Sequence, residues 1–254
     1  MRQNIRYITS PKNVGSEAKR DEKMTFILLA ENYGYRMKSY GPLPLINIGD
    51  KTLIEHQINA ISSTFIDFEI ILCSGFETHR IYHYLHSNFP QSLPIRIVEN
   101  QVYYHSNCCE GLRLCMNNTR NNRIVVCGGG VLLTIPYLKS LNIKKSSILY
   151  QENDKESTFD VGVIENGDRL ENLSLAVKDK VWTDLLYLNG DVMIKSFYNT
   201  ISKPELKTKF LFEAINLWRG KRQIYLSENK DEKILKVDNI KTLKRITDNE
   251  NIVS

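Results

Sequence analysis

Between Thr25 and Ala30 the chain carries an apolar run in which hydrophobic and polar residues do not alternate. Such a run is typical of a strand covered on both faces, as in a parallel sheet. Similar patterns predict further strands at 68–73, 95–98 and 123–127. Helical spacings between them predict helices at about 52–61, 77–85 and 109–117. Strands and helices that alternate in this way indicate βαβ units, so we expect an α/β fold with a Rossmann-like, mainly parallel sheet flanked by helices.

The pattern changes after about residue 145, where short strands are expected at 147–151, 159–164 and 185–188. The turn Asn166-Gly167 is a hairpin signal. Further helices are expected at about 209–218 and 240–246. We therefore predict one domain over residues 24–254, in which 146–254 adds a small β-rich insertion to 24–145. The polar residues 1–23 are expected to form an extension outside the domain.

Composition argues against several classes of protein. The net charge is +5, from 34 Lys and Arg against 29 Asp and Glu, and the cations are scattered rather than gathered in a stripe, so no nucleic-acid binding is expected. The five cysteines lack CxxC spacing, which favours reduced, mostly buried thiols over disulfides or a zinc site. Because the sequence shows neither a signal-peptide core nor a membrane-length apolar run, we expect a cytoplasmic protein with no membrane partner.

Two loops stand out, because ligands of open α/β sheets bind beyond the carboxyl ends of the strands. The loop after the first strand reads Leu29-Ala30-Glu31-Asn32-Tyr33-Gly34-Tyr35-Arg36-Met37, and it is followed by Gly41-Pro42-Leu43-Pro44-Leu45 and then by Gly49-Asp50-Lys51-Thr52-Leu53-Ile54. This order resembles the sugar-phosphate nucleotidyltransferases, whose pattern is L-A-A-G-x-G-x-R-M, then K-P-L, then G-K-P-L-I. The segment 106–112, with Asn107, is similar to the N-x-x-S-L segment of the cytidylyltransferase and choline-phosphate branch. Gly129-Gly130-Val131 stands where the family has G-D-V, and Asp238 resembles its late acidic residue.

The resemblance implies a reaction in which a phosphate oxygen attacks the α-phosphorus of a nucleoside triphosphate and expels pyrophosphate, with Mg²⁺ as cofactor. The partners would be a nucleoside triphosphate and a phosphorylated small molecule. Residues 24–145 would be the nucleotide-binding half and 146–254 the acceptor-side half. Arg36 would contact phosphate and Asp238 would be a metal carboxylate whose family partner position is Gly130. The implied nucleotide-binding residues are Ala30, Asn32, Gly34, Arg36, Asn107 and Gly129.

The chain departs from the family at residues that carry charge. Leu43 stands at the position of the family's lysine, Gly130 at that of its metal-binding aspartate, and Glu31 replaces a small residue near the expected phosphates. Asn32 replaces the first loop glycine and is a residue that tolerates the left-handed region. Partial substitutes would be Lys38 or Lys51 for the cation and Asp191 or Glu213 for the carboxylate.

Two hypotheses remain open. The first is a nucleotidyltransferase-like protein with impaired catalysis, which either binds a nucleotide or sugar phosphate or acts as a structural or interaction component with protein partners or as a homo-oligomer, including in a virion. The second is an active Mg²⁺-dependent cytidylyl- or uridylyltransferase that acts on a phosphorylated sugar or alcohol.

Other candidates are weaker. His79, His83 and His86 share one face of a predicted helix, a spacing that solvent-facing residues show more often than metal ligands do. Cys108-Cys109 lie near His105, but adjacency alone does not indicate a nucleophile. Trp182, Asp184 and Phe212-Glu213 fall where the family shapes its acceptor pocket, and there they either select substrate or simply pack.

Overall fold

The computed structural model describes residues 23–153, 157–230 and 233–248. Its strands are β1 (Met24–Leu29), β2 (Asn47–Ile48), β3 (Lys51–Thr52), β4 (Phe68–Ser74), β5 (Ile95–Glu99), β6 (Arg123–Gly128), β7 (Ser147–Glu152), β8 (Gly162–Asn166), β9 (Arg169–Ser174), β10 (Lys180–Asn189) and β11 (Tyr225–Glu228). Its α-helices are α1 (Leu53–Thr64), α2 (Thr78–Asn88), α3 (Cys108–Met116), α4 (Ile135–Lys139), α5 (Asp191–Ile201), α6 (Leu211–Arg219) and α7 (Ile240–Asp248). The extension predicted for 1–23 lies outside the described residues, apart from Lys23.

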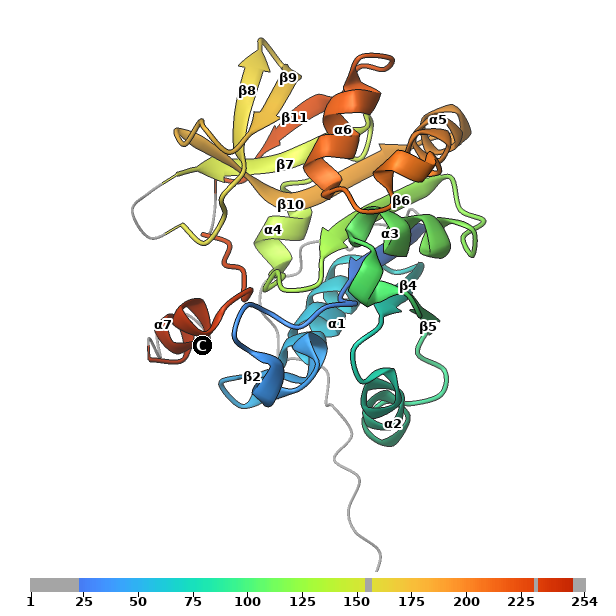
Figure 1. Ribbon diagram of the computed structural model, residues 1–254, viewed down its shortest axis with the longest axis vertical. Helices are drawn as coiled ribbons and strands as arrows, with labels where there is room; N and C mark the ends of the chain where they lie inside the picture. The colour runs from blue at the N-terminus through green and yellow to red at the C-terminus, as the bar shows by residue number, and fades with distance from the viewer. Residues whose placement is uncertain (1–22, 154–156, 231–232, 249–254) are drawn as a thin grey trace, which may run out of the picture.

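One large sheet runs through the molecule in the order β5-β4-β1-β6-β10-β7-β11-β9-β8 (Figure 1). The strands from β5 to β6 are parallel, and β10 then pairs antiparallel with β6. In the second half β7 is antiparallel to β10 and parallel to β11, and a β8–β9 hairpin completes the sheet. The expected α/β fold with a β-rich addition is confirmed, and the two parts share a single sheet.

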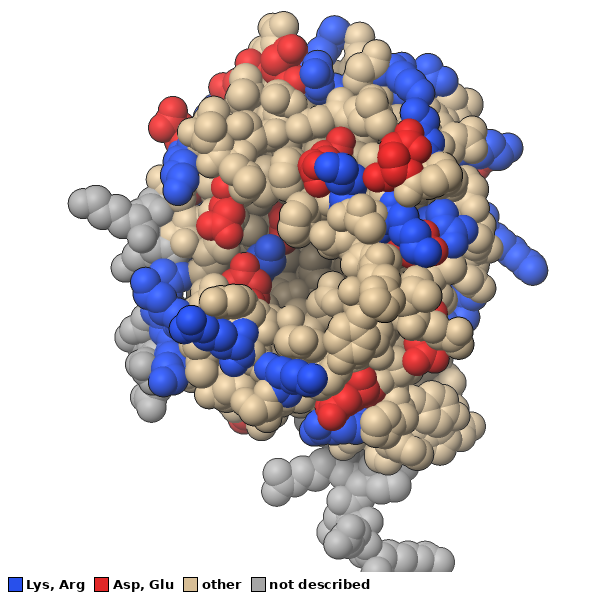
Figure 2. Space-filling model, in the orientation of Figure 1, with Lys and Arg blue, Asp and Glu red and all other residues tan. Residues whose placement is uncertain are grey.

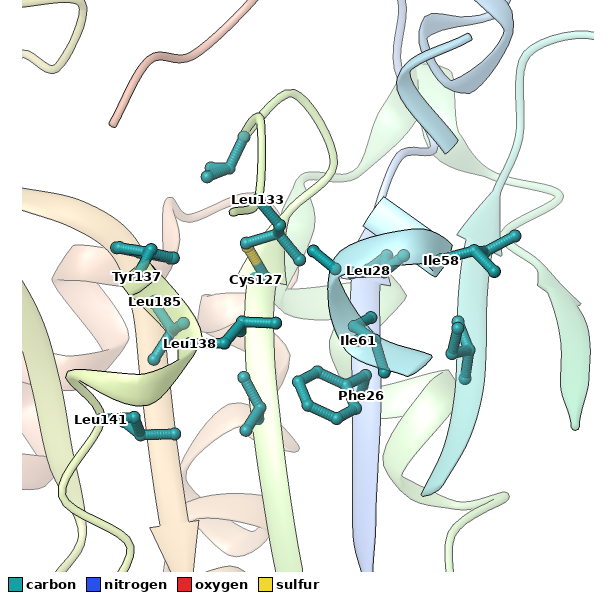
Figure 3. Packing of buried hydrophobic residues seen from close by; sticks show 14 of the residues in the cluster. Phe26, Leu28, Ile58, Ile61, Cys127, Leu133, Tyr137, Leu138, Leu141 and Leu185 are labelled. Carbon is teal, nitrogen blue, oxygen red and sulfur yellow. The ribbon is translucent and has the colours of Figure 1, made fainter. Parts of the chain in front are cut away.

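Helices cover both faces of the sheet. Consecutive residues of a strand point to opposite faces, so an apolar strand such as β1 needs packing partners on both sides. Phe26 and Leu28 of β1 pack with α1, α2 and α4 on one face, part of which Figure 3 shows. Ile27 points to the other face, which α3, α5 and α6 cover. This two-sided burial explains why the first strand reads as an unbroken apolar run.

Several elements differ from the sequence-based expectation. The strand β11 and the helices α4 and α5 were not anticipated, β10 is longer than the expected 185–188, and β8 begins at Gly162 rather than at 159, whereas β9 completes the hairpin that Asn166-Gly167 predicts. Helix α5 buries Phe197, Thr200 and Ile201, and its apolar residues Ile194, Phe197 and Ile201 recur at helical spacing, so the signal for this helix was present in the sequence. No helix in the described part of the chain is both long enough and apolar enough to cross a membrane.

A third apolar cluster joins the carboxyl-terminal segment to the loops beyond β1 and β6. It contains Leu43, Leu132 and Val237 together with Leu243 of α7. Val131 forms an antiparallel bridge with Lys236, and the Tyr35 amide donates to the Asp238 carbonyl over 2.7 Å. The late segment is therefore fixed at the carboxyl edge of the parallel strands, where a ligand site is expected.

Candidate functional site

A cavity of about 490 Å³ opens at the carboxyl ends of β1 and β6. Figure 2 shows the corresponding face, which is hollowed near its middle with acidic and basic side chains at one edge. Its walls come from the loop after β1, the glycines after β6, strand β10, the start of α6 and the segment before α7. The lining includes Asn32, Tyr33, Gly34, Leu43, Cys108, Gly128–Gly130, Asp160, Trp182, Asp184, Phe210–Phe212 and Lys236–Asp238.

The glycines after β6 are required by close packing of the backbone. The Gly129 amide donates to the Leu29 carbonyl over 2.9 Å, and a Cβ at Gly129 would lie 2.5 Å from that of Ala30. A Cβ at Gly130 would clash with the carbonyl oxygen of Val237. It would also lie 3.6 Å from Cδ2 of Leu43. Leu43 and Gly130, the two positions at which the resemblance implies charged residues, are therefore neighbours in one wall.

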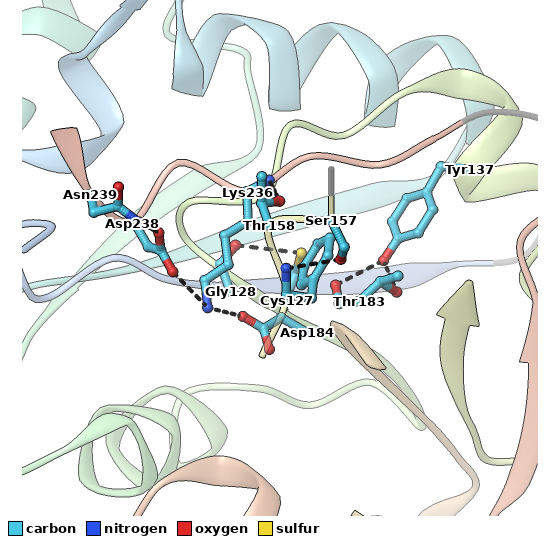
Figure 4. A network of polar contacts seen from close by, with 11 residues as sticks. Cys127, Gly128, Tyr137, Ser157, Thr158, Thr183, Asp184, Lys236, Asp238 and Asn239 are labelled. Carbon is cyan, nitrogen blue, oxygen red and sulfur yellow. Dashed lines mark hydrogen bonds and ion pairs between the residues drawn. The ribbon is translucent and has the colours of Figure 1, made fainter. Parts of the chain in front are cut away.

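Three charged side chains meet inside the cavity, as Figure 4 shows. The Lys236 Nζ lies 2.6 Å from Asp184 Oδ2 and 3.7 Å from Asp238 Oδ2. Burial acts to lower the pKa of Lys236, but Asp184 and Asp238 together raise it above its ordinary value. Burial raises the pKa of Asp238 by more than the neighbouring Lys236 lowers it. The ammonium is thus firmly held in its charged form between two carboxyl groups.

The local backbone geometry at Asp184 and Lys236 brings their side chains together. Asp184 has φ +56°, and it sits where the register of β10 against β7 shifts between Trp182 and Leu185. Such a bulge redirects a side chain, and Asp is among the residues that tolerate the left-handed region. Lys236 is fixed by its own backbone, whose amide donates to Thr158 Oγ1 over 2.7 Å.

Glu31 lines the cavity but is only 2% exposed. Its carboxyl group lies beside Gly111 of α3 and the Cys73 thiol, and neither oxygen has a hydrogen bond of normal geometry within the described chain. Burial raises the pKa of Glu31. The side chain is therefore packed beneath α3, which corrects the expectation of a charged group projecting toward phosphates.

Glu31→Gln should make the protein less sensitive to rising pH. A carboxyl group whose folded-state pKa is raised contributes stability at low pH, and that stability is lost as the pH rises from its ordinary value of about 4.5 through the folded-state pKa. The variant should therefore gain stability relative to the native protein as the pH rises, as measured by urea unfolding at a series of pH values. Parallel pH profiles for the two proteins would contradict this.

The structure brings most of the residues implied by the resemblance to one place. Asn32, Gly34, Gly129, Gly130 and Asp238 line the cavity, and Ala30 packs directly behind Gly129. Asn32 does not have a positive φ, whereas Arg36 does, at +59°. The left-handed residue of the loop is thus Arg36.

Two implied residues lie outside the lining. Arg36 is exposed, with its guanidinium 5.1 Å from the ring centre of Tyr35, which does line the cavity. Asn107 caps α3 by accepting a 2.8 Å hydrogen bond from the Cys108 amide. Arg36 is therefore placed at the rim, and Asn107 has a structural task that needs no ligand.

The substitutes considered from sequence also separate. Lys38 lies at the rim, with Nζ 5.8 Å from the ring centre of Tyr33. None of the other three substitutes lines the cavity. Lys51 belongs to β3 and Asp191 to α5, and Glu213 accepts a hydrogen bond from the Phe210 amide at the start of α6. Trp182 and Asp184 do line it, as their placement by the resemblance implied.

Lys236 is the functional side chain that sequence reasoning missed. Its position two residues before Asp238 was the available signal, but nothing in the sequence places Asp184 beside it. Of the remaining candidates, His79 and His83 line a separate hollow beside α2, whereas Cys108 lines the cavity. No set of three or more potential metal ligands gathers within the described residues. The five cysteines are free, and Cys108 is less buried than the others.

Comparison with known proteins identifies the fold. No protein-family model matches the sequence, and no curated protein matches it significantly. Among solved structures, CTP:phosphocholine cytidylyltransferase from Streptococcus pneumoniae matches with a TM-score of 0.68 at 15% identity, over 89% of this chain and 98% of that one. A putative glucose-1-phosphate thymidylyltransferase from Bacillus anthracis matches with a TM-score of 0.73 at 16% identity, over 91% and 96% of the two chains.

The inositol-1-phosphate CTP transferase from T. maritima also matches, with a TM-score of 0.69 at 12% identity, over 91% of this chain and 98% of that one. The chain has the fold of the sugar-phosphate nucleotidyltransferases. The cavity of this nucleotidyltransferase-like chain lies at the carboxyl edge of its parallel strands, where open α/β folds bind ligands.

Proposed function

We propose that the protein binds a nucleotide or a phosphorylated small molecule in this cavity and that its capacity for nucleotidyl transfer is impaired. The observation that carries the proposal is the pairing of Leu43 with Gly130 in one wall. An apolar side chain and a glycine stand together where the family resemblance implies a cation and a metal carboxylate. In this proposal residues 24–145 are the nucleotide half and 146–254 the acceptor half.

The walls suit a ligand with a flat or apolar part and a phosphate end. Tyr33, Trp182 and Phe212 line a volume in the usual range for small-molecule sites. Arg36 and Lys38 supply positive charge at the rim, beside aromatic rings of the lining. We therefore place the phosphates toward the loop after β1 and the remainder of the ligand within the cavity.

The same cavity is poorly equipped for phosphoryl chemistry. Among the described lining residues Lys236 is the one cation, and Glu31, Asp160, Asp184 and Asp238 are acidic. Transfer of a nucleotidyl group depends largely on positioning and charge neutralisation. Loss of two stabilising charges, each contributing about 3 kcal/mol, would slow the reaction by roughly 10⁴-fold.

Fluorescence titration tests the binding. Trp182 lines the cavity, whereas Trp218 is fully buried against Phe197, so a ligand should change the emission of Trp182. CTP, UTP, dTTP and phosphorylated sugars and alcohols are the probes, and at least one should give a saturable change that Trp182→Phe removes. Arg36→Ala should lower the affinity for that probe by about tenfold, the usual scale for one charge-assisted contact.

Arg120→Ala is the matched control, because Arg120 is exposed in the loop before β6, at the opposite edge of the sheet. It should leave binding unchanged. If no probe gave a saturable response, the binding function would be wrong and the structural or interaction role would remain. Size-exclusion chromatography would then show whether the protein forms an assembly. Equal effects of the two arginine variants would contradict the placement of the phosphates.

The competing function is an active Mg²⁺-dependent cytidylyl- or uridylyltransferase. The feature that favours it is the presence of two carboxyl groups, Asp184 and Asp238, in the same cavity. Pyrophosphate release separates the two functions, since binding alone produces none.

A further inference from the structure

The charged cluster inside the cavity resembles a cation site in which the ammonium group of Lys236 takes the place of a bound ion. The Lys236 ammonium contacts Asp184 Oδ2 at 2.6 Å and Asp238 Oδ2 at 3.7 Å. The two carboxyl groups come from segments far apart in the chain, β10 and the stretch before α7. Asp160, on a third segment, is also close enough to raise the pKa of Lys236 through its charge. Among the described residues, the Lys236 ammonium is the cation that lies between them and offsets their mutual repulsion.

The backbone shows that this arrangement is built in. Asp184 adopts a left-handed conformation at a bulge, and Lys236 is fixed by its bridge to Val131 and by the hydrogen bond from its amide to Thr158. A non-glycine residue in that conformation carries strain that the surrounding contacts must offset. Here the 2.6 Å ion pair is the contact that the strained residue makes.

The residues present do not fit the Mg²⁺ that the family resemblance implies. Mg²⁺ requires oxygen ligands at about 2.0–2.1 Å in octahedral geometry. The Lys236 Nζ already lies 2.6 Å from Asp184 Oδ2, so an ion bound to that carboxyl group would sit against a like charge. Gly130 offers no ligand, and any Cβ there would clash with Val237.

We propose that Lys236 replaces the divalent cation of this site: its tethered ammonium holds Asp184 and Asp238 together, so that the native protein takes no metal there, and removal of the ammonium creates a divalent-cation site. The inference does not depend on which ligand the cavity binds. In this proposal the site has not lost its cation, because the Lys236 ammonium stands in place of a divalent metal ion.

Mn²⁺ binding to the native protein and to Lys236→Ala tests the proposal, with free Mn²⁺ measured by electron paramagnetic resonance. The variant should bind one Mn²⁺ at least about tenfold more tightly than the native protein, because the competing charge is gone. Lys236→Arg keeps the charge and should bind no better than the native protein. Adding Asp238→Asn to Lys236→Ala should abolish the gain.

A second measurement covers the case in which Lys236→Ala does not fold. In the native background Asp238→Asn should leave Mn²⁺ affinity unchanged, since Asp238 is paired with the ammonium rather than with a metal. A loss of about tenfold or more in that variant would show that the native site already binds the ion and would overturn the proposal. Equal Mn²⁺ affinity of the native protein and a folded Lys236→Ala would overturn it as well.

Discussion

Gly130→Ala should lower the free energy of unfolding by about 2–3 kcal/mol, the usual scale for forcing atoms into a packed interior. The added Cβ would clash with the Val237 carbonyl oxygen, and the Val237 amide donates to the Gly130 carbonyl over 2.8 Å, so the two segments joined at this isolated bridge cannot easily move apart. Gly130→Asp should be destabilised at least as strongly and should not restore a metal site. Urea denaturation with paired native samples measures both.

Gly220→Ala is the matched control for Gly130. Gly220 ends α6 with a negative φ, and a Cβ there would meet Leu217 at an ordinary 3.6 Å. We expect its stability to stay within about 0.5 kcal/mol of the native value or to rise slightly. If Gly130→Ala and Gly220→Ala were equally stable, the packing described for the carboxyl edge of β6 would be wrong.

Lys236→Met should cost about 1–3 kcal/mol at pH 7, less than a fully buried pair because the three side chains are partly exposed. The substitution leaves Asp184 and Asp238 facing each other without a counter-charge. Burial already raises the pKa of Asp238, and removal of the neighbouring ammonium would raise it further, so the loss of stability should be small near the ordinary Asp pKa of about 3.9 and grow as the pH rises. Denaturant unfolding at about pH 4.5 and pH 7 measures the difference.

Lys180→Met controls for the loss of a surface ion pair. Its ammonium lies 2.7 Å from Glu165 and its side chain is 26% exposed, the same as that of Lys236, but it pairs with one half-exposed carboxylate. A loss below about 1 kcal/mol is expected there. Similar losses in the two variants, or a Lys236→Met deficit that does not depend on pH, would show that the cluster in the cavity has no special electrostatic role.

Local patterns were sufficient to predict the four parallel strands of the first half and the helices α1, α2 and α3. The doubly buried strand β1 reads as an unbroken apolar run, and Thr52 caps α1 as part of a capping box with Glu55. In the second half, β11 is only four residues long and pairs with β7 and β9, which are distant in sequence. Such strands depend on cross-strand packing more than on intrinsic propensity.

The candidate site was predictable only where order along the chain reflects position in space. Gly34, Gly129 and Asp238 follow the family order and do line one cavity. The burial of Glu31 depends on the close approach of Gly111 in α3, and the contact between Lys236 and Asp184 depends on a bulge in β10. Both are tertiary features that residue spacing does not encode.

Pyrophosphate release under multiple-turnover conditions tests the proposed loss of transfer most directly. The native protein would be incubated with each nucleoside triphosphate, Mg²⁺ and a panel of phosphorylated sugars and alcohols. We predict turnover at least about 10³-fold below the 10 s⁻¹ typical of enzymes, unchanged in Arg36→Ala. Turnover near about 10 s⁻¹ that Arg36→Ala abolishes would contradict the account and establish an active nucleotidyltransferase.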